Sequence, residues 1–209
     1  MIPLDSIQII SLPHRRDRRD ILIPTIKKAI DLGVFPDLEI EIVNRFPVET
    51  SLVPSWWEFS ESYYRCTREH TEILQNLYQR RSKLALILED DAIIKNNLYT
   101  DLEPFYNEVN RIRPEWASLF IGGRDTKNKG RERINDLVSL NRGCLGSHAY
   151  IVNPIGMKLL HDHISKGEDI VDWGYLKLMG KHSVFYSPPD YMVDTQPGWS
   201  DNLNKFSSF

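Results

Sequence analysis

The sequence predicts a single α/β domain, built on a mainly parallel β-sheet with helices on its faces. Short β-branched or apolar runs alternate along the chain with longer amphipathic segments, and one of these runs, Leu84–Leu88, is apolar at every position. No internal repeat or Pro/Gly/Ser-rich linker divides the 209 residues. Alternating strands and helices favour parallel strands joined by right-handed crossovers. We therefore expect residues 1–209 to form one domain.

The predicted strands are short runs of apolar and β-branched residues. Leu84–Leu88 has no polar position, which is typical of a parallel strand that is covered on both faces. In open sheets of this kind, ligands bind beyond the carboxyl ends of the strands. Functional residues are therefore expected just after the strands, which we place at 7–12, 39–43, 84–88, 117–121 and 147–152.

The helices are predicted from apolar residues at helical spacing. Pro24 suits a first helical turn and Gly33 suits a helix end, so we expect a helix over residues 25–32 and a separate turn over 17–23. Further helices are expected at 60–81, 102–112 and 154–164. The long helix presents one apolar face, made of Cys66, His70, Ile73, Leu74 and Leu77.

Composition and charge exclude several classes of protein. Hydrophobic residues make up 41% of the chain and charged residues 26%, which is typical of a globular protein. The formal net charge of −3 gives no support to nucleic-acid binding. Two cysteines cannot form a disulfide framework, and no signal peptide or membrane-spanning run is recognised. We expect no transmembrane segment and a cytoplasmic location, with peripheral contact to a membrane left open.

Residues 188–209 are rich in proline, aspartate and aromatic residues, including Tyr191 and Trp199. Aromatic side chains offer apolar faces, and Trp and Tyr also carry a polar group. This C-terminal tail is expected either to be mobile and close over a bound ligand, or to pack on the surface of the domain.

Three carboxylates, Glu89, Asp90 and Asp91, follow the buried apolar run directly. Like charges at a strand end repel each other, and a hard divalent cation offsets them. Mg²⁺ or Mn²⁺ takes oxygen ligands and commonly joins one or two carboxylates to substrate phosphates. The alternative is a solvated acidic turn.

This acidic segment resembles the Glu-Asp-Asp motif of glycosyltransferase family 25, which contains lipooligosaccharide and procollagen galactosyltransferases. Ile9–Arg18 is similar to the opening strand of that family and its Leu-…-Arg-Arg-x-Asp-Arg turn. Cys66–His70 is similar to its Gly-Cys-x-x-Ser-His helix, with Arg65 in place of the glycine and Glu69 in place of the serine. Three further segments match in the same order, so that the resemblance covers nearly the whole chain: Gly146–Leu160, Val171–Trp173 and Gln196–Asp201.

The resemblance implies a nucleotide-sugar-binding domain of the GT-A type, with Mn²⁺ (or Mg²⁺) held by the acidic motif. Asp91 is the first candidate for metal contact and Asp90 the second. Both Asp90 and Glu89 are candidates for the donor site, where Glu89 would reach the ribose or a water molecule beside the metal.

Arg15 and Arg18 lie just past the first strand, where a diphosphate would bind. The planar guanidinium donates paired hydrogen bonds to phosphate oxygens, and Arg18 aligns with the Asp-Arg of the family turn. The alternative is a solvated basic turn in which Asp17 pairs with a neighbouring arginine. His70 is a further donor-side candidate because it matches the family helix. Its alternative is a hydrogen-bonded histidine of the core.

The acceptor hydroxyl must lose a proton as it attacks, and the family inverts at the anomeric carbon. A carboxylate on the acceptor side is therefore expected as general base. Asp172 is the candidate, because it matches the Val-Asp motif of the family. Glu168, Asp169 and Asp125 are alternatives.

These features predict a metal-dependent glycosyltransferase that moves a hexose from a UDP-sugar to a hydroxyl group on a glycan or a hydroxylated protein. Galactose is the sugar that the resemblance implies first, and glucose follows. The alternative is a non-catalytic nucleotide-sugar or carbohydrate-binding module of the same fold. A metal-dependent nuclease is disfavoured by the nearly neutral charge.

Overall fold

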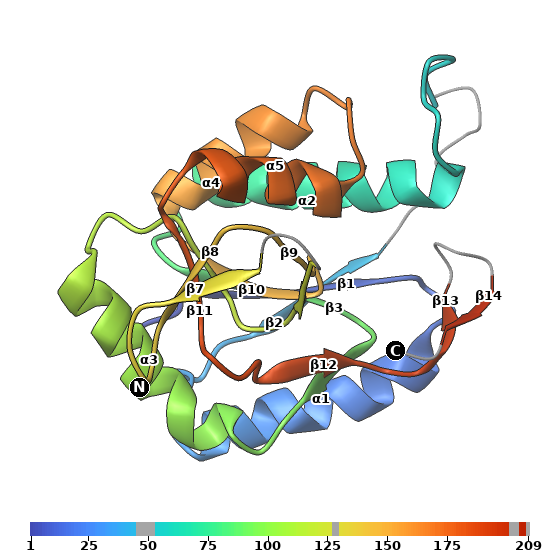
Figure 1. Cartoon of the computed structure of the whole chain (residues 1–209). Coiled ribbons are helices and arrows are strands. Elements are labelled where there is room, and N and C mark those ends of the chain that lie inside the picture. Colours follow the sequence, from blue (N-terminus) through green and yellow to red (C-terminus); the bar gives the residue numbers. More distant parts are fainter. Residues whose placement is uncertain (45–52, 127–129, 201–204, 208–209) are drawn as a thin grey trace.

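The computed structural model describes residues 1–44, 53–126, 130–200 and 205–207. An eight-stranded sheet lies between two layers of helices, with α2, α4 and α5 on one face and α1 and α3 on the other (Figure 1). The helices are α1 (Arg16–Asp31), α2 (Glu61–Gln79), α3 (Leu98–Ile112), α4 (Pro154–Ile164) and α5 (Val171–Lys181). No helix of these described residues is long and apolar enough to cross a membrane.

The strand order of the sheet is β2-β1-β3-β10-β5-β11-β8-β7. All strands except β10 and β8 run in one direction. The predicted α/β domain with a mainly parallel sheet is therefore confirmed, with two antiparallel strands inserted. The bounds are β2 (Ile40–Asn44), β1 (Ser6–Ser11), β3 (Ala85–Glu89), β10 (Ala149–Val152), β5 (Ser118–Phe120), β11 (Phe185–Ser187), β8 (Ser139–Asn141) and β7 (Arg131–Arg133).

Smaller pairs of strands surround this sheet. Three two-stranded sheets are formed by β4 (Ala92–Ile94) with β12 (Val193–Thr195), β6 (Arg124–Asp125) with β9 (Cys144–Leu145), and β13 (Gly198–Ser200) with β14 (Lys205–Ser207). Strand β4 directly follows the acidic run after β3, β6 follows β5, and β9 precedes β10.

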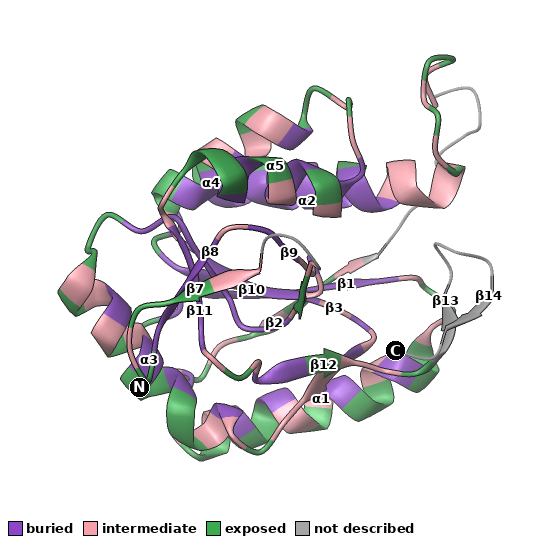
Figure 2. Ribbon diagram, in the orientation of Figure 1, coloured by how far each residue is buried: buried purple, intermediate pink, exposed green. Residues whose placement is uncertain are grey.

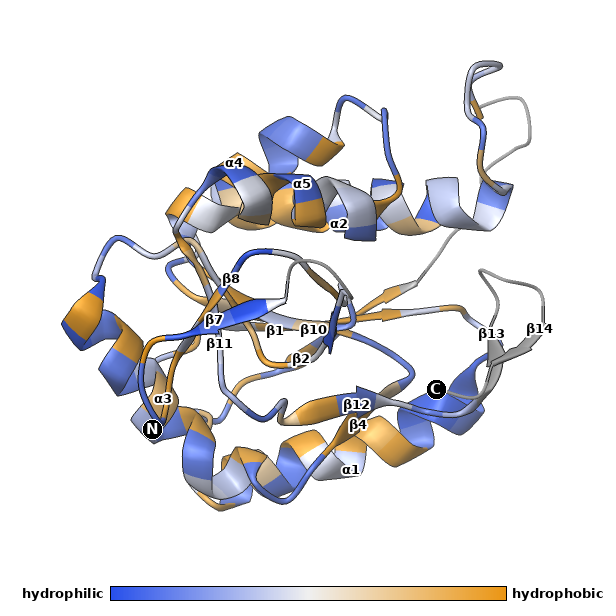
Figure 3. Cartoon of the chain, viewed as in Figure 1, coloured by the Kyte–Doolittle hydropathy of each residue, from blue (hydrophilic) through white to orange (hydrophobic). Residues whose placement is uncertain are grey.

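The central strand β3 is covered on both faces, as its apolar run predicts. Leu86 and Leu88 pack in the core on the side of α1 and α3, and Ala85 and Ile87 pack in the core on the side of α2, α4 and α5. Figure 2 shows this buried centre, and Figure 3 shows hydrophobic residues along the central strands and alternating with polar ones along the helices. Each fully buried Leu or Ile side chain stabilises the fold by about 1.5–3 kcal/mol.

Helix α1 corrects one prediction. It begins at Arg16 and runs through Pro24 to Asp31, where a helix over 25–32 preceded by a separate turn was expected. The buried positions Arg18, Leu22 and Ile26 follow one another at intervals of four residues, so one continuous face packs on the sheet. Packing of this face offsets the hydrogen bond that proline cannot donate.

The predicted long helix is confirmed as α2, and its expected apolar face is buried at all five positions. Helix α3 begins earlier than predicted, at Leu98 rather than residue 102. Leu98 and Leu102 are both buried, and burial of the extra turn accounts for the earlier start.

Part of the predicted C-terminal tail is an integral piece of the domain. Strand β12 pairs with β4, and Met192 and Val193 are buried. The backbone N–H of Gln196 donates a hydrogen bond of 2.7 Å to the carbonyl oxygen of Asp91. This return of the chain anchors the segment that follows the acidic run. Residues 201–204 and 208–209 of the predicted tail lie outside the described residues.

Candidate functional site

The three carboxylates of the acidic run lie at the carboxyl edge of the central parallel strands. Glu89 is the last residue of β3 and pairs with Ile10 of β1. The N–H of Asp90 donates to the carbonyl oxygen of Ile10, and the N–H of Glu89 donates to that of His148, both at 2.9 Å. The backbone of the acidic run is therefore held by its neighbours on both sides of β3.

Arg18 lies behind this acidic run, in the first turns of α1. Its Nη1 is 2.9 Å from Oδ1 of Asp90 and 3.8 Å from Oδ2 of Asp91. The side chains of Arg18 and Asp90 are 9% and 8% exposed, and that of Asp91 is 24% exposed. This geometry favours a role for Arg18 in holding the carboxylates. The predicted direct contact of Arg18 with a diphosphate stays a prediction.

The neighbouring arginines stabilise the turn between β1 and α1. The guanidinium of Arg15 bonds to Asp17, with Nε to Oδ1 and Nη2 to Oδ2 both at 3.2 Å, and this lowers the pKa of the Asp17 carboxyl group. Arg19 Nη1 donates to Ser11 Oγ and to the carbonyl oxygen of Leu12, both at 2.6 Å. The alternative in which Asp17 pairs with a neighbouring arginine is therefore the arrangement that the structure shows for Arg15.

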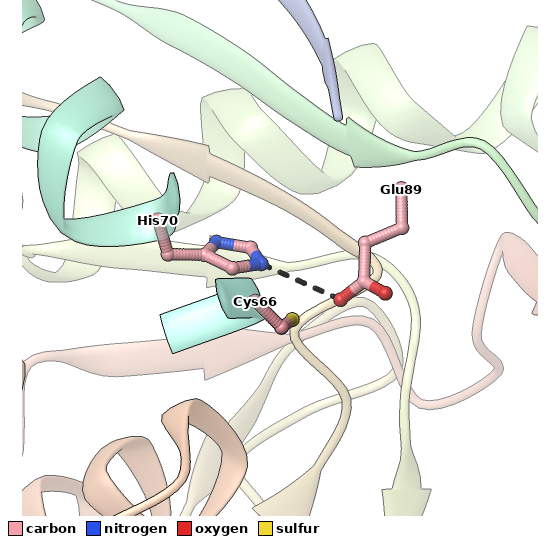
Figure 4. A group of neighbouring side chains, drawn as sticks. All are labelled: Cys66, His70 and Glu89. Atoms are coloured by element: carbon pink, nitrogen blue, oxygen red, sulfur yellow. Dashed lines mark hydrogen bonds and ion pairs between the residues drawn. The ribbon is translucent and has the colours of Figure 1, made fainter. Parts of the chain in front are cut away.

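His70 and Glu89 come together from α2 and β3 (Figure 4). His70 Nε2 lies 3.4 Å from Oε1 of Glu89, and its Nδ1 lies 2.9 Å from the hydroxyl group of Tyr150. The Tyr150 hydroxyl group is in turn 3.0 Å from that of Tyr175. Because His70 is fully buried, the structure supports the alternative that it is a hydrogen-bonded core histidine. Its contact with a donor stays a prediction.

Ser147 joins the acidic run to Asp172. Its Oγ donates to Oε1 of Glu89 at 2.7 Å, and its backbone N–H donates to Oδ1 of Asp172 at 2.9 Å. Asp172 lies in the first turn of α5, on a different segment from the acidic run. One serine therefore links a carboxylate at the end of β3 with the carboxylate that the sequence proposes as a base. Ser147 lies in the segment Gly146–Leu160 that resembles the family, but no role was predicted for it.

Three glycines create the close packing around Ser147. A Cβ atom on Gly146, whose φ is +140°, would lie 2.6 Å from Cα of Gly123. A Cβ atom on Gly122 would lie 2.4 Å from Nε2 of His148. The loop before β10 can approach the loop after β5 only because these positions lack side chains. The Gly122-Gly123 pair thus allows close approach of the backbone at Gly146.

Two of the three alternative carboxylates are engaged in ion pairs elsewhere. Oδ1 of Asp125 is 2.8 Å from Nε of Arg131, and Oδ2 of Asp169 is 2.6 Å from Nζ of Lys177. Glu168 is exposed. Asp172 is the carboxylate among these candidates that is bonded into the network of Glu89.

A chain of aromatic side chains runs from residues 56–59 to Trp173, the residue that follows Asp172. Trp57 contacts Trp56 and Phe59 edge to face, with ring centroids 6.4 and 5.3 Å apart. Phe59 contacts Trp173 at 5.4 Å. Trp56 is 57% exposed and Trp173, which directly follows Asp172, is 48% exposed. The density of aromatic residues between positions 56 and 64 was the available signal in the sequence.

Two groups of described side chains have the chemistry to hold a cation. Asp91 is the more accessible aspartate of the acidic run, whereas Asp90 is bound to Arg18, so an oxygen-binding cation such as Mn²⁺ or Mg²⁺ fits Asp91 better. The second group, Cys66, His70 and Glu89, offers sulfur, nitrogen and oxygen atoms that all lie within 4.8 Å of one another.

A cavity of about 490 Å³ lies between α1 and the edge strand β2, lined in part by Ile23, Lys27, Leu38 and Ile40. None of its lining residues belongs to the acidic run or to the network of Ser147. The chemistry of the carboxylates therefore indicates the candidate site better than this cavity does.

Comparison with known proteins gives one curated relative. The chain is 22% identical over 152 residues to procollagen galactosyltransferase 2 of Mus musculus, a match that spans 65% of this chain and 24% of that protein. The match thus covers about a quarter of the length of the relative. No family model matches the chain.

Among solved structures, the chain is similar to a glycosyltransferase involved in the glycosylation of the major capsid of PBCV-1, with a TM-score of 0.46, 12% identity and coverage of 78% of this chain and 67% of that one. It is also similar to UDP-glucose pyrophosphorylase complexed with UDP-glucose, with a TM-score of 0.47, 9% identity and coverage of 91% and 74%. A third is CMP:2-keto-3-deoxy-manno-octonic acid synthetase complexed with CTP, with a TM-score of 0.45, 10% identity and coverage of 87% and 88%.

Proposed function

We propose that the chain is a divalent-metal-dependent glycosyltransferase of the GT-A type, similar to family 25. In this proposal it transfers a hexose, galactose or glucose, from a UDP-sugar to a hydroxyl group on a glycan or a hydroxylated protein, with inversion at the anomeric carbon. The relationship to a procollagen galactosyltransferase supports this class of reaction.

The observation that carries the proposal is that carboxylates from two different segments are linked through one residue near the end of β3. Glu89 and Asp91 follow β3, and Asp172 comes from α5, with Ser147 bonded to both Glu89 and Asp172. Glycosyl transfer needs one group of side chains at the leaving diphosphate and a separate base at the acceptor. In this proposal, Glu89 and Asp91 serve the donor side and Asp172 serves the acceptor side.

On the donor side, Asp91 would hold the cation and Arg18 would keep Asp90 and Asp91 in place through its ion pairs. When bound, the cation would stabilise the negative charge that develops on the leaving diphosphate. Glu89 is the proposed partner of the ribose. Arg15 is proposed to contact the donor, and the buried His70 is proposed to act on the donor side through Glu89, whose Oε1 lies 3.4 Å from its Nε2.

On the acceptor side, Asp172 would take the proton from the attacking hydroxyl group. Its Oδ1 already accepts the N–H of Ser147, which orients the carboxylate. Trp173 directly follows Asp172 in the chain, and its half-exposed ring offers an apolar face on which a sugar ring can pack.

The proposal is tested by thermal unfolding of the protein with UDP-galactose and UDP-glucose, each with and without Mn²⁺, followed by measurement of UDP release. A ligand that binds the native state at a hundredfold excess over its dissociation constant stabilises it by roughly 2.7 kcal/mol. We expect stabilisation that requires Mn²⁺, and slow UDP release without acceptor. The matched control is Asp136→Asn, an exposed carboxylate paired with Arg133, which should behave as wild type.

Two results would count against the proposal. If neither nucleotide sugar stabilised the protein in the presence of Mn²⁺, the assignment of a UDP-sugar as the donor would be wrong. Mn²⁺-dependent binding without UDP release, with or without a panel of glycan acceptors, would instead indicate a non-catalytic binding module.

A further inference from the structure

Cys66, His70 and Glu89 form a compact group of three different metal-binding side chains (Figure 4). Cys66 and His70 are four residues apart on α2, so that both face the sheet, and Glu89 meets them from the end of β3. Cys66 is 2% exposed and His70 is fully buried. This group is separate from the pair Asp90 and Asp91, which Arg18 contacts.

We propose that this group is a zinc site. Zinc is bound by cysteine sulfur at about 2.3 Å and by histidine nitrogen or carboxylate oxygen at about 2.0–2.2 Å, in a tetrahedral arrangement. Ligand atoms around such an ion are therefore about 3.3–3.8 Å apart. His70 Nε2 and Glu89 Oε1 are already 3.4 Å apart, and all three ligand atoms lie within 4.8 Å of one another. Binding requires only a small movement of the ligands.

The ligand atoms of Cys66, His70 and Glu89 determine which metal the group binds best. A thiolate and an imidazole suit zinc, whereas Mg²⁺ and Mn²⁺ prefer oxygen atoms. The cysteine thiolate and the glutamate carboxylate together carry two negative charges, which balance the charge of Zn²⁺. This balance matters because an unpaired charge at such a buried place is costly. Three protein ligands leave a fourth position for water.

The surroundings of the three ligands are those that a metal site needs. A metal-bound histidine usually donates its second ring N–H to an oxygen atom, and the Nδ1 of His70 is 2.9 Å from the hydroxyl group of Tyr150. Tyr150 in turn contacts the hydroxyl group of Tyr175 at 3.0 Å. Ser147 Oγ donates to Oε1 of Glu89 and orients that carboxylate. His70 and Glu89 therefore each have a hydrogen-bond partner that fixes the orientation of the side chain.

The competing explanation is a metal-free network in which His70 donates its Nε2–H to Glu89. The two explanations predict different amounts of zinc retained by the chain. The purified chain is freed of metal with a chelator, incubated with ZnCl₂, desalted and analysed by plasma mass spectrometry. The zinc site predicts about one zinc per chain, and the metal-free network predicts none.

Variants locate the ion. Cys66→Ser, His70→Gln and Glu89→Gln should each lower retained zinc by at least about tenfold, while Asp91→Asn should leave it unchanged. The matched control is Cys144→Ser, because Cys144 is the other buried cysteine and burial raises the pKa of its thiol to about 12. This variant should retain zinc as wild type does.

Cobalt gives an independent signal that does not depend on the variants folding well. Co²⁺ added to the metal-free wild-type chain should produce the near-ultraviolet absorption of a cobalt–thiolate bond, and one equivalent of Zn²⁺ should abolish it. A wild-type chain that retains no zinc and shows no cobalt–thiolate absorption would overturn the proposal. Equal retention of zinc by wild type and Cys66→Ser would also overturn it.

Discussion

The backbone N–H of Ser147 donates a hydrogen bond of 2.9 Å to Oδ1 of Asp172. The hydroxyl group of the same serine donates to Glu89, so that the end of β3 and the start of α5 are joined through a single residue. Ser147 reaches this position because Gly146 packs against Gly123. The distance between Glu89 on the proposed donor side and Asp172 on the proposed acceptor side therefore depends on the conformation of the short loop before β10.

This dependence predicts that Gly146→Ala destabilises the protein by at least about 2 kcal/mol, because φ is +140° and the new Cβ would lie 2.6 Å from the backbone of Gly123. The matched control is Gly180→Ala in α5, where a Cβ meets nothing within 4 Å. It should stabilise the helix by about 0.5–1 kcal/mol. Urea unfolding measures both changes, and equal effects would show that the loop tolerates a side chain.

The ion pair of Arg18 and Asp90 leads to a second prediction. Arg18→Ala leaves a buried carboxylate without its cation and should lower the free energy of unfolding by about 3–5 kcal/mol. Arg16→Ala is the control, since Arg16 is 83% exposed and its pair with Asp20 contributes at most about 1 kcal/mol. If Arg18→Ala kept its stability but lost binding of UDP, Arg18 would be a direct ligand of the diphosphate, as the sequence alone suggested.

Local patterns predicted much of the fold. The buried face of α2 follows from residues at helical spacing, and burial of β3 on both faces follows from its apolar run. Pro24 misled the prediction because its local preference for a first turn was overruled by packing of Leu22 and Ile26 on the sheet. The antiparallel insertion of β10 between β3 and β5 could not be predicted, because strand order depends on contacts far apart in sequence.

The candidate site likewise combines residues that local patterns predicted with contacts that they could not predict. The sequence selected Glu89 and Asp172 separately, but the link between them runs through Ser147, which has no distinctive local pattern. Similarly, Arg18 was predicted to contact a diphosphate, whereas the structure pairs it with Asp90, which lies 72 positions further along the chain. Residue type and spacing therefore select candidate groups, whereas their partners depend on contacts between residues far apart in the sequence.

The metal assignment leads to a third prediction. Asp91→Asn should weaken Mn²⁺-dependent binding of the UDP-sugar by at least about tenfold, because an amide oxygen replaces a charged ligand. Stability should change little, since the Asp91 side chain is partly exposed and its distance to Arg18 is 3.8 Å. Isothermal titration with and without Mn²⁺ measures this effect, with Asp136→Asn as the control. Unchanged donor binding in Asp91→Asn would require another cation site.

The last prediction concerns the base. Asp172→Asn keeps an oxygen atom that can accept the N–H of Ser147, so the loop and α5 should stay in place. The amide cannot take a proton from the acceptor hydroxyl group at neutral pH. We therefore expect kcat to fall by roughly 10²–10⁴-fold, with little change in donor affinity. The measurement is steady-state sugar transfer to an acceptor found by screening, together with the binding of the UDP-sugar to the variant.

Two matched variants make this test specific to Asp172. Asp169→Asn and Asp125→Asn remove carboxylates that are paired with Lys177 and Arg131, and both variants should turn over at nearly the wild-type rate. If one of them lost activity while Asp172→Asn kept it, the base would lie elsewhere at this edge. If Asp172→Asn instead lost donor binding, Asp172 would position the sugar, because a group that acts only as a base contributes to the transition state and not to the affinity for the donor.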